Sequence, residues 1–297
     1  MHALLSRSRS LSVVAFAALC AAAGAQVVNP ADKQRPPDPL PGEIDVTQVP
    51  TTTVTAKRVS QYREEDRVGE YGQPEWTTQR LWPTTRVYVR PPGSFAFEYW
   101  MRPTIPREGP TELQTQYEFE MGLPNRFQFD MYIVSNQEGN DGPMVFDEQK
   151  FEIRYALADW GKIWGNPTLY GEIVHRDSEA DVIEAKLLFG DEIRPGLHWG
   201  TNLVYEHEMG GDQENVYELT AGVSQVIRDS KLSIGGETKI EFENVDDDGE
   251  DVESAFLVGP TLQYRPTAQI HLDVVALAGL GGESPEAQGF FVLGYEF

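Results

Sequence analysis

The chain ends with Gly289-Phe290-Phe291-Val292-Leu293-Gly294-Tyr295-Glu296-Phe297. Every second side chain counted back from Phe297 is large and apolar, which is the period of a β-strand with one apolar face. In a soluble sheet, such a terminal strand would leave an apolar edge open to aggregation. In a closed barrel embedded in lipid, the same strand has a partner on both sides and hydrocarbon against its apolar face. The stretch therefore predicts the closing strand of a transmembrane β-barrel.

Most of the preceding chain repeats this pattern in segments of about ten residues separated by turn residues. The clearest segment is 231–243, where Ile240 and Phe242 alternate with Lys239 and Glu241. An even number of strands places both ends of a barrel on the same side of the membrane. We expect twelve strands, near 94–103, 111–122, 125–135, 148–159, 167–176, 182–193, 196–208, 215–227, 231–243, 253–265, 268–280 and 289–297.

The connections between these segments sort into two classes. Alternation alone also fits a soluble β-sandwich or a lipocalin-like barrel, but it does not require such sorting. The short connections are expected on the periplasmic side and the longer, more acidic ones on the outer side. The short ones are 122–125, 159–166, 194–196, 228–230 and 266–267, and the long ones are 135–148, 177–181, 210–215 and 246–251.

A secretory signal peptide is predicted over residues 1–25. Arg7 and Arg9 form its charged front, Leu11 to Ala22 its apolar centre, and Ala23-Gly24-Ala25 a small-residue cleavage site. The apolar run is too short to span a bilayer as a helix. We therefore expect cleavage after Ala25 and export from the cytoplasm.

Composition excludes several classes of function. The chain has 24 Lys and Arg against 47 Asp and Glu, a net charge of −23, which disfavours binding to nucleic acid. Its single cysteine, Cys20, lies inside the predicted signal. The mature chain therefore has no disulfide, thiolate metal site or cysteine nucleophile.

Residues 26–93 form an extension of different composition. Five prolines between Asn29 and Gly42 indicate an extended linker. Residues 62–92 contain Trp76 and Trp82 among prolines and glycines, so they are expected to be irregular and to pack on something. They fit either at the periplasmic mouth of the barrel or partly inside it.

The segment 51–58, Thr-Thr-Thr-Val-Thr-Ala-Lys-Arg, resembles the TonB box of TonB-dependent outer-membrane receptors. That peptide pairs with TonB as an added strand. The resemblance implies TonB as a partner, although the large barrel and globular plug of those receptors are missing here. A threonine-rich linker is the alternative. The matching residues are Thr53, Val54, Thr55 and Ala56.

If the apolar faces meet lipid, the opposite faces line the interior. Charges there must be hydrated or paired, because an isolated buried charge is costly. Cross-paired charges would close the lumen, whereas partly unpaired ones would give a narrow, cation-favouring pore. The candidate lumen-lining residues are Glu98, Arg102, Glu118, Glu120, Asp130, Lys150, Glu152, Arg154, Glu172, Arg176, Glu184, Lys186, Glu206, Glu218, Glu237, Lys239, Arg265, His271 and Asp273.

Neither an enzyme nor a metal or cofactor site is expected. The His-x-Ser motif of outer-membrane phospholipases and lipid A deacylases is absent. His271 and Asp273 have the spacing of omptin-like proteases, but they follow a predicted periplasmic turn and so lie at the wrong end. The acidic stretch from Asn244 to Gly249 only partly matches a Ca²⁺-binding loop, with Ala255 where the last ligand should be.

The terminal strand resembles the C-terminal signature of bacterial outer-membrane β-barrels. That resemblance implies the outer membrane of a Gram-negative bacterium, with outer-membrane lipid, lipopolysaccharide and the barrel assembly machinery as partners. In barrel size, polar interior and last strand, the chain is also similar to the small transporter-like barrels grouped with the MetA pathway of phenol degradation. That similarity implies passage of small solutes.

The resulting prediction is an all-β, antiparallel up-and-down transmembrane barrel over 94–297, behind an irregular periplasmic extension over 26–93. We expect a channel for small solutes, gated or energised through the extension. The alternative is a non-conducting structural or surface-binding barrel that acts through its acidic outer loops.

Overall fold

The computed structural model describes residues 64–139, 141–177, 179–210, 214–228, 231–244 and 252–297. The predicted signal peptide, the proline-rich linker and the TonB-box-like segment 51–58 therefore lie outside the described residues. Most of the acidic stretch between Asn244 and Ala255 does too.

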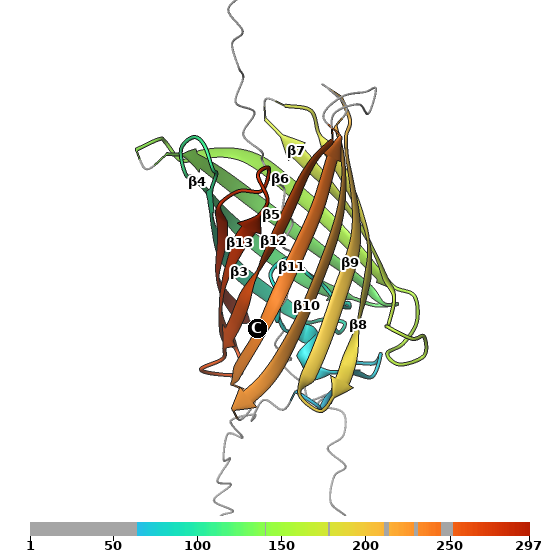
Figure 1. Cartoon of the computed structure of the whole chain (residues 1–297). Helices are drawn as coiled ribbons and strands as arrows, with labels where there is room; N and C mark the ends of the chain where they lie inside the picture. Colours follow the sequence, from blue (N-terminus) through green and yellow to red (C-terminus); the bar gives the residue numbers. More distant parts are fainter. Residues whose placement is uncertain (1–63, 140, 178, 211–213, 229–230, 245–251) are drawn as a thin grey trace, which may run out of the picture.

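Twelve antiparallel strands close into one barrel (Figure 1), which confirms the predicted fold class. The first and last strands pair with each other, with Tyr295 opposite Phe97, so no edge is left open. The strands are β3 (Phe95–Ile105), β4 (Glu112–Leu123), β5 (Phe127–Glu138), β6 (Val145–Ala156), β7 (Thr168–Arg176), β8 (Val182–Arg194), β9 (Leu197–Glu208), β10 (Asn215–Arg228), β11 (Leu232–Asn244), β12 (Val252–Tyr264), β13 (Ile270–Leu280) and β14 (Ala287–Glu296).

The predicted connections differ from the structure at two places. The expected outer loop 135–148 is shorter, because β5 continues to Glu138 and β6 begins at Val145. The connection 157–167 is long although it lies on the rim that also holds Phe297, where short turns were expected. We call this rim the terminal rim and the opposite one the distal rim.

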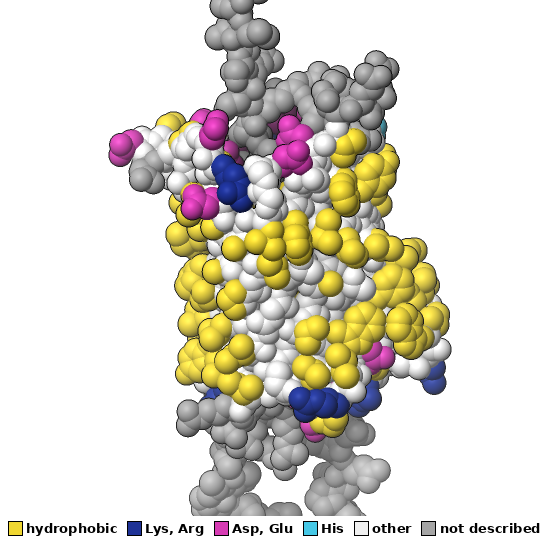
Figure 2. Space-filling model, viewed as in Figure 1, with side chains coloured by type: hydrophobic (Ala, Val, Ile, Leu, Met, Phe, Trp, Pro, Cys, Tyr) yellow, Lys and Arg dark blue, Asp and Glu magenta, His cyan; other side chains and the backbone are white. Residues whose placement is uncertain are grey.

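The outer face of the barrel is apolar over its middle height. Figure 2 shows hydrophobic side chains over the wall, with the acidic and basic side chains gathered toward the two ends. Leu203, near the middle of β9, is 52% exposed, as expected for a side chain that meets hydrocarbon. Within the described residues, no helix is long and apolar enough to cross a membrane.

The residues before β3 fold onto and into the barrel. Two short strands, β1 (Arg67–Val68) and β2 (Gln73–Pro74), pair with each other. Gly69 and Gly72 take positive φ in the turn between them, a conformation that glycine adopts without strain. The 3-10 helix η3 (Glu75–Thr78) follows, and residues 79–90, all described, belong to no strand or helix.

This small β1–β2 unit sits at the terminal rim. The Tyr71 hydroxyl donates to the carbonyl of Leu123 at 3.1 Å and accepts from the backbone N–H of Arg126 at 2.7 Å. The backbone N–H of Trp160, in the long connection, donates to the Tyr71 carbonyl at 3.1 Å. The connection 157–167 therefore helps to hold the segment that enters the barrel.

The lipid-facing assignment predicts a depth-dependent effect of charge on stability. Replacing Leu203 by Arg is expected to lower the free energy of unfolding by about 2–4 kcal/mol, because it puts a charge near the bilayer midplane. Ile193→Arg is the matched control: this side chain is 58% exposed near the terminal end of β8, where the cost falls to about 0–1 kcal/mol. Equilibrium unfolding in phospholipid vesicles measures both, and equal costs would contradict the assignment.

Candidate functional site

The inner face of the wall carries the ionisable residues picked out by alternation. Of the nineteen candidates, all are buried except Arg176, which is half-buried near the distal end of β7. Most pair along the wall. Arg154 Nη2 lies 3.0 Å from Asp130 Oδ2, and Lys239 Nζ lies 2.7 Å from Glu218 Oε2. Such pairing is required because an uncompensated buried charge is strongly destabilising.

The interior is not uniformly polar, contrary to the sequence-based description. One sector formed by β12, β13, β14 and β3 turns apolar side chains inward. Alternation could not find it, because the strands there are apolar on both faces and only the outward set was assigned. The residues of this sector are Trp100, Ala255, Leu257, Val275, Leu277, Phe290 and Val292.

The N-terminal segment occupies the interior. Residues 76–90, which we call the inserted segment, form an unbroken run of buried residues. Because the segment forms no strand with the wall, its buried backbone groups need other partners. Polar wall side chains supply them. The Thr84 N–H donates to Glu237 Oε1 at 2.8 Å, and the Arg90 N–H donates to Gln128 Oε1 at 2.8 Å.

Asn202 on β9 holds the inserted segment through both backbone groups of Arg86, the N–H and the C=O. Its Oδ1 accepts the Arg86 N–H at 2.6 Å, and its Nδ2 donates to the Arg86 carbonyl at 2.6 Å. An amide side chain thereby takes the place of a neighbouring strand. From the short strand β2, Gln73 Nε2 donates to the Val89 carbonyl at 2.8 Å. These contacts satisfy several backbone groups of the inserted segment while leaving it outside the β-ladder.

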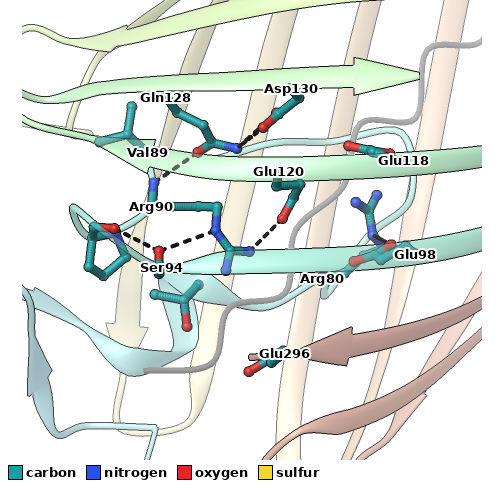
Figure 3. A network of polar contacts seen from close by, with 12 residues as sticks. Arg80, Val89, Arg90, Ser94, Glu98, Glu118, Glu120, Gln128, Asp130 and Glu296 are labelled. Carbon is teal, nitrogen blue, oxygen red and sulfur yellow. Dashed lines mark hydrogen bonds and ion pairs between the residues drawn. The ribbon is translucent and has the colours of Figure 1, made fainter. Parts of the chain in front are cut away.

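Three arginines of the inserted segment lie on wall carboxylates, and Figure 3 shows two of them, Arg80 and Arg90. Arg80 Nε is 3.1 Å from Glu98 Oε2. Arg90 Nη1 is 2.5 Å from Glu120 Oε2, and Arg86 Nη2 is 3.4 Å from Glu120 Oε1. All of these groups are buried, so the contacts are charge-assisted and weakly screened by water.

The carboxylates come together through strand register. Glu120 on β4 lies opposite Asp130 on β5, and one carboxylate oxygen from each of Glu118, Glu120 and Asp130 lies within 4.8 Å of the other two. Like charges facing across a sheet destabilise it. Here Arg154 neutralises Asp130 from the wall, while Arg86 and Arg90 compensate Glu120 from the inserted segment.

A row of glycines makes room for the segment. Gly190, Gly200 and Gly222 stand opposite one another on β8, β9 and β10. A Cβ at Gly222 would lie 2.4 Å from the Trp82 ring, and one at Gly190 would lie 2.5 Å from Val87. Only a wall without side chains at this row accommodates the segment so closely.

Sequence reasoning missed the inserted arginines and the glycine row. A signal for the first was present: between Glu75 and Glu98 the chain holds three arginines and no acidic residue, in a protein with a net charge of −23. The glycine row can be recognised only from strand register, because the three glycines are adjacent only after the strands pair. His271, the candidate lumen histidine, is buried, with Nδ1 2.5 Å from Asp273 Oδ2 and Nε2 3.1 Å from Glu98 Oε1.

Comparison with known proteins supports the architecture alone. No protein-family model and no curated protein matches the chain. Among solved structures, the chain is similar to an outer membrane channel from Pseudomonas putida F1, at 9% identity over 70% of this chain and 97% of that chain, with a TM-score of 0.50. The fold is that of a bacterial outer-membrane barrel. The NanC porin (15% identity, 68% and 98% covered, TM-score 0.47) and the KdgM porin (12%, 68% and 99%, 0.46) are also similar.

The glycine row predicts a selective effect on the inserted segment. Gly222→Ala is expected to weaken docking of residues 76–90 by about 1–3 kcal/mol, the usual cost of overpacking, while the barrel still forms. Gly171→Ala is the control, because a Cβ at Gly171 meets no atom within 4 Å. Hydrogen exchange of the segment measures docking. Unchanged exchange in Gly222→Ala would contradict the close packing of Trp82 on this row.

Docking of the inserted segment is expected to depend on pH through Glu64, which lies at the terminal rim. Burial, with Glu192 and Glu65 nearby, raises the pKa of Glu64 from 4.5 to about 7. The docked form therefore binds more protons than a released form, and docking weakens as pH rises from about 4.5 to about 7. Glu64→Gln removes this ionisation.

Hydrogen exchange of residues 76–90 tests this pH dependence, with wild type and Glu64→Gln compared at the same pH. At pH ~8, where Glu64 is ionised, Glu64→Gln is expected to slow the exchange relative to wild type. At pH ~4, where the carboxyl is protonated in both the docked and the released form, the two proteins are expected to behave alike. The same effect at both pH values would show that the substitution acts by packing and not through ionisation.

Proposed function

We propose that this protein is an outer-membrane channel for small solutes. The inserted segment closes the channel, and withdrawal of that segment opens it. The observation that carries the proposal is the attachment of the segment. Residues 79–90 join the wall through side chains, and β1 and β2 pair only with each other among the described strands. Withdrawal toward the terminal rim would break no barrel strand pairing.

The number of strands supports a removable filling. Eight strands give an interior that the wall's own side chains fill, and sixteen or more leave an aqueous channel. Twelve strands lie between, and here a separate stretch of chain takes the remaining space. The channel from Pseudomonas putida F1 shares the fold, which is compatible with the proposal.

The charge of the interior favours cations. The buried Lys and Arg of the wall are fewer than its buried acids, so the wall alone is electronegative and attracts positive solutes. The basic residues are Arg102, Lys150, Arg154, Lys186, Lys239 and Arg265, against Glu98, Glu118, Glu120, Asp130, Glu148, Glu152, Glu172, Glu184, Glu206, Glu218, Glu237, Glu241, Asp273 and Glu296.

The location and the energy source belong to the same proposal. We place the barrel in the outer membrane, among its lipids and lipopolysaccharide, after insertion by the barrel assembly machinery. The terminal rim then faces the periplasm, and the extension 26–93 enters the barrel from that side. A pull by TonB on segment 51–58 would act on the inserted segment through the chain at Glu64. This last step rests on the sequence resemblance alone.

Conductance in planar bilayers tests the channel. Arg80→Gln/Arg86→Gln/Arg90→Gln is expected to raise the open fraction well above that of wild type, because each substitution removes a buried charge-assisted contact of about 1.5–3 kcal/mol. The reversal potential in a salt gradient is expected to show preference for cations. The control is Lys162→Gln/Arg194→Gln/Lys231→Gln, which changes the net charge equally at exposed positions.

Silence of wild type and both variants at all voltages would contradict the channel. It would favour the second candidate, a non-conducting barrel that acts through the acidic connections of the distal rim. The observation behind that candidate is the filled interior itself, since a lumen held shut at all times conducts nothing.

A further inference from the structure

Two binding positions on the wall, which we call seats, hold the guanidinium groups of the inserted segment. In the first, Glu98 accepts from Arg80 Nε at 3.1 Å, and the Arg80 guanidinium lies over the Trp100 ring, 4.1 Å from its centre. A carboxylate beside an aromatic face suits a planar, delocalised cation. A compact, strongly hydrated cation gains less from such a seat.

The second seat lies on the next strand. Glu120 takes Arg90 Nη1 at 2.5 Å and Arg86 Nη2 at 3.4 Å, so one carboxylate serves two guanidinium groups. Arg86 Nη2 is also 4.0 Å from Glu118 Oε1. Glu98 and Glu118 stand opposite each other on β3 and β4, which joins the two seats into one surface.

The tethered arginines do not satisfy this surface fully. Among the described residues, Arg80 Nη1 and Nη2 make no hydrogen bond although the side chain is buried, and Glu118 Oε1 accepts none. In Figure 3 the Arg80 guanidinium points from Glu98 toward Glu118. Gln263 donates to the Arg80 carbonyl and thereby fixes the backbone from which this side chain reaches. Unmade hydrogen bonds of buried polar groups are costly.

We propose that Glu98, Glu118, Glu120 and Trp100 form a receptor for small organic cations that carry a guanidinium group, which the protein's own arginines occupy in the closed form. The receptor stands by itself. The further statement that such cations are the transported solutes rests on the proposed channel function. A free cation would replace a tethered one, so the exchange buries no additional net charge. Binding would thereby favour release of the inserted segment.

A metal ion fits this surface less well. Glu118, Glu120 and Asp130 are close enough to share an ion. However, Arg154 belongs to the wall and stays on Asp130, at 3.0 Å, when the inserted segment leaves. Trp100 also offers a metal ion no ligand. The set of groups therefore selects a planar organic cation.

The test uses the full chain with Arg86→Ala/Arg90→Ala, which vacates the seat at Glu120, and two matched probes. Arginine amide carries the guanidinium group, and citrulline amide replaces it by a neutral urea. Isothermal titration in detergent is expected to show binding of arginine amide and no binding of citrulline amide. Adding Glu120→Gln is expected to weaken that binding at least about tenfold, the loss of one charged hydrogen bond. Adding Glu138→Gln, at the exposed end of β5, should leave it unchanged.

Several outcomes would overturn the receptor: no binding of arginine amide, equal binding of both probes, or binding of Ca²⁺ in place of arginine amide. If the double variant does not fold, wild type supplies the test. Arginine amide is then expected to speed hydrogen exchange of residues 76–90, and an equal effect of citrulline amide would overturn the proposal. Binding of arginine amide by a protein that conducts nothing would refute the channel and keep the receptor. Conduction without selective binding would do the reverse.

Discussion

The constraint on which this structure depends is compensation of charge inside a closed wall. Because lipid takes the apolar face of every strand, the polar face has only the interior, where water is scarce and an unpaired charge is costly. The wall meets part of this demand itself, as with Arg154 and Asp130 or Lys239 and Glu218. It leaves an excess of carboxylates, which concentrates where Glu120 and Asp130 face each other across β4 and β5.

The inserted segment offsets part of that excess and creates a second problem. Its three arginines bring positive charge to Glu98 and Glu120. Its backbone, however, arrives in a region where every N–H and C=O needs a partner. The side chains of Asn202, Gln128 and Glu237 supply partners for Arg86, Arg90 and Thr84, and the glycine row gives Trp82 and Val87 the space they require. The segment is thus bound much as a peptide ligand is bound, through side-chain contacts that can be exchanged.

This mode of attachment gives the proposed function and the proposed receptor their common basis. A filling made of wall side chains could not leave, whereas a separate peptide can. A receptor that already holds guanidinium groups has its chemistry displayed by the protein itself, in the contacts of Arg80, Arg86 and Arg90. The apolar sector around Phe290 and Leu257 differs from the rest of the interior, since its side chains carry no charge of their own.

The sequence by itself determined the wall. Alternation from the terminal strand back to Phe95 indicated the twelve strands and the ionisable residues that turn inward, because the period of a strand is local and lipid imposes one rule on all of them. The contents of the barrel were decided only by tertiary structure. Whether Trp82 sat at the mouth or inside depended on Gly190, Gly200 and Gly222 meeting in one row, and the partner of each arginine depended on register. These relations join residues far apart in the chain, and no local pattern encodes them.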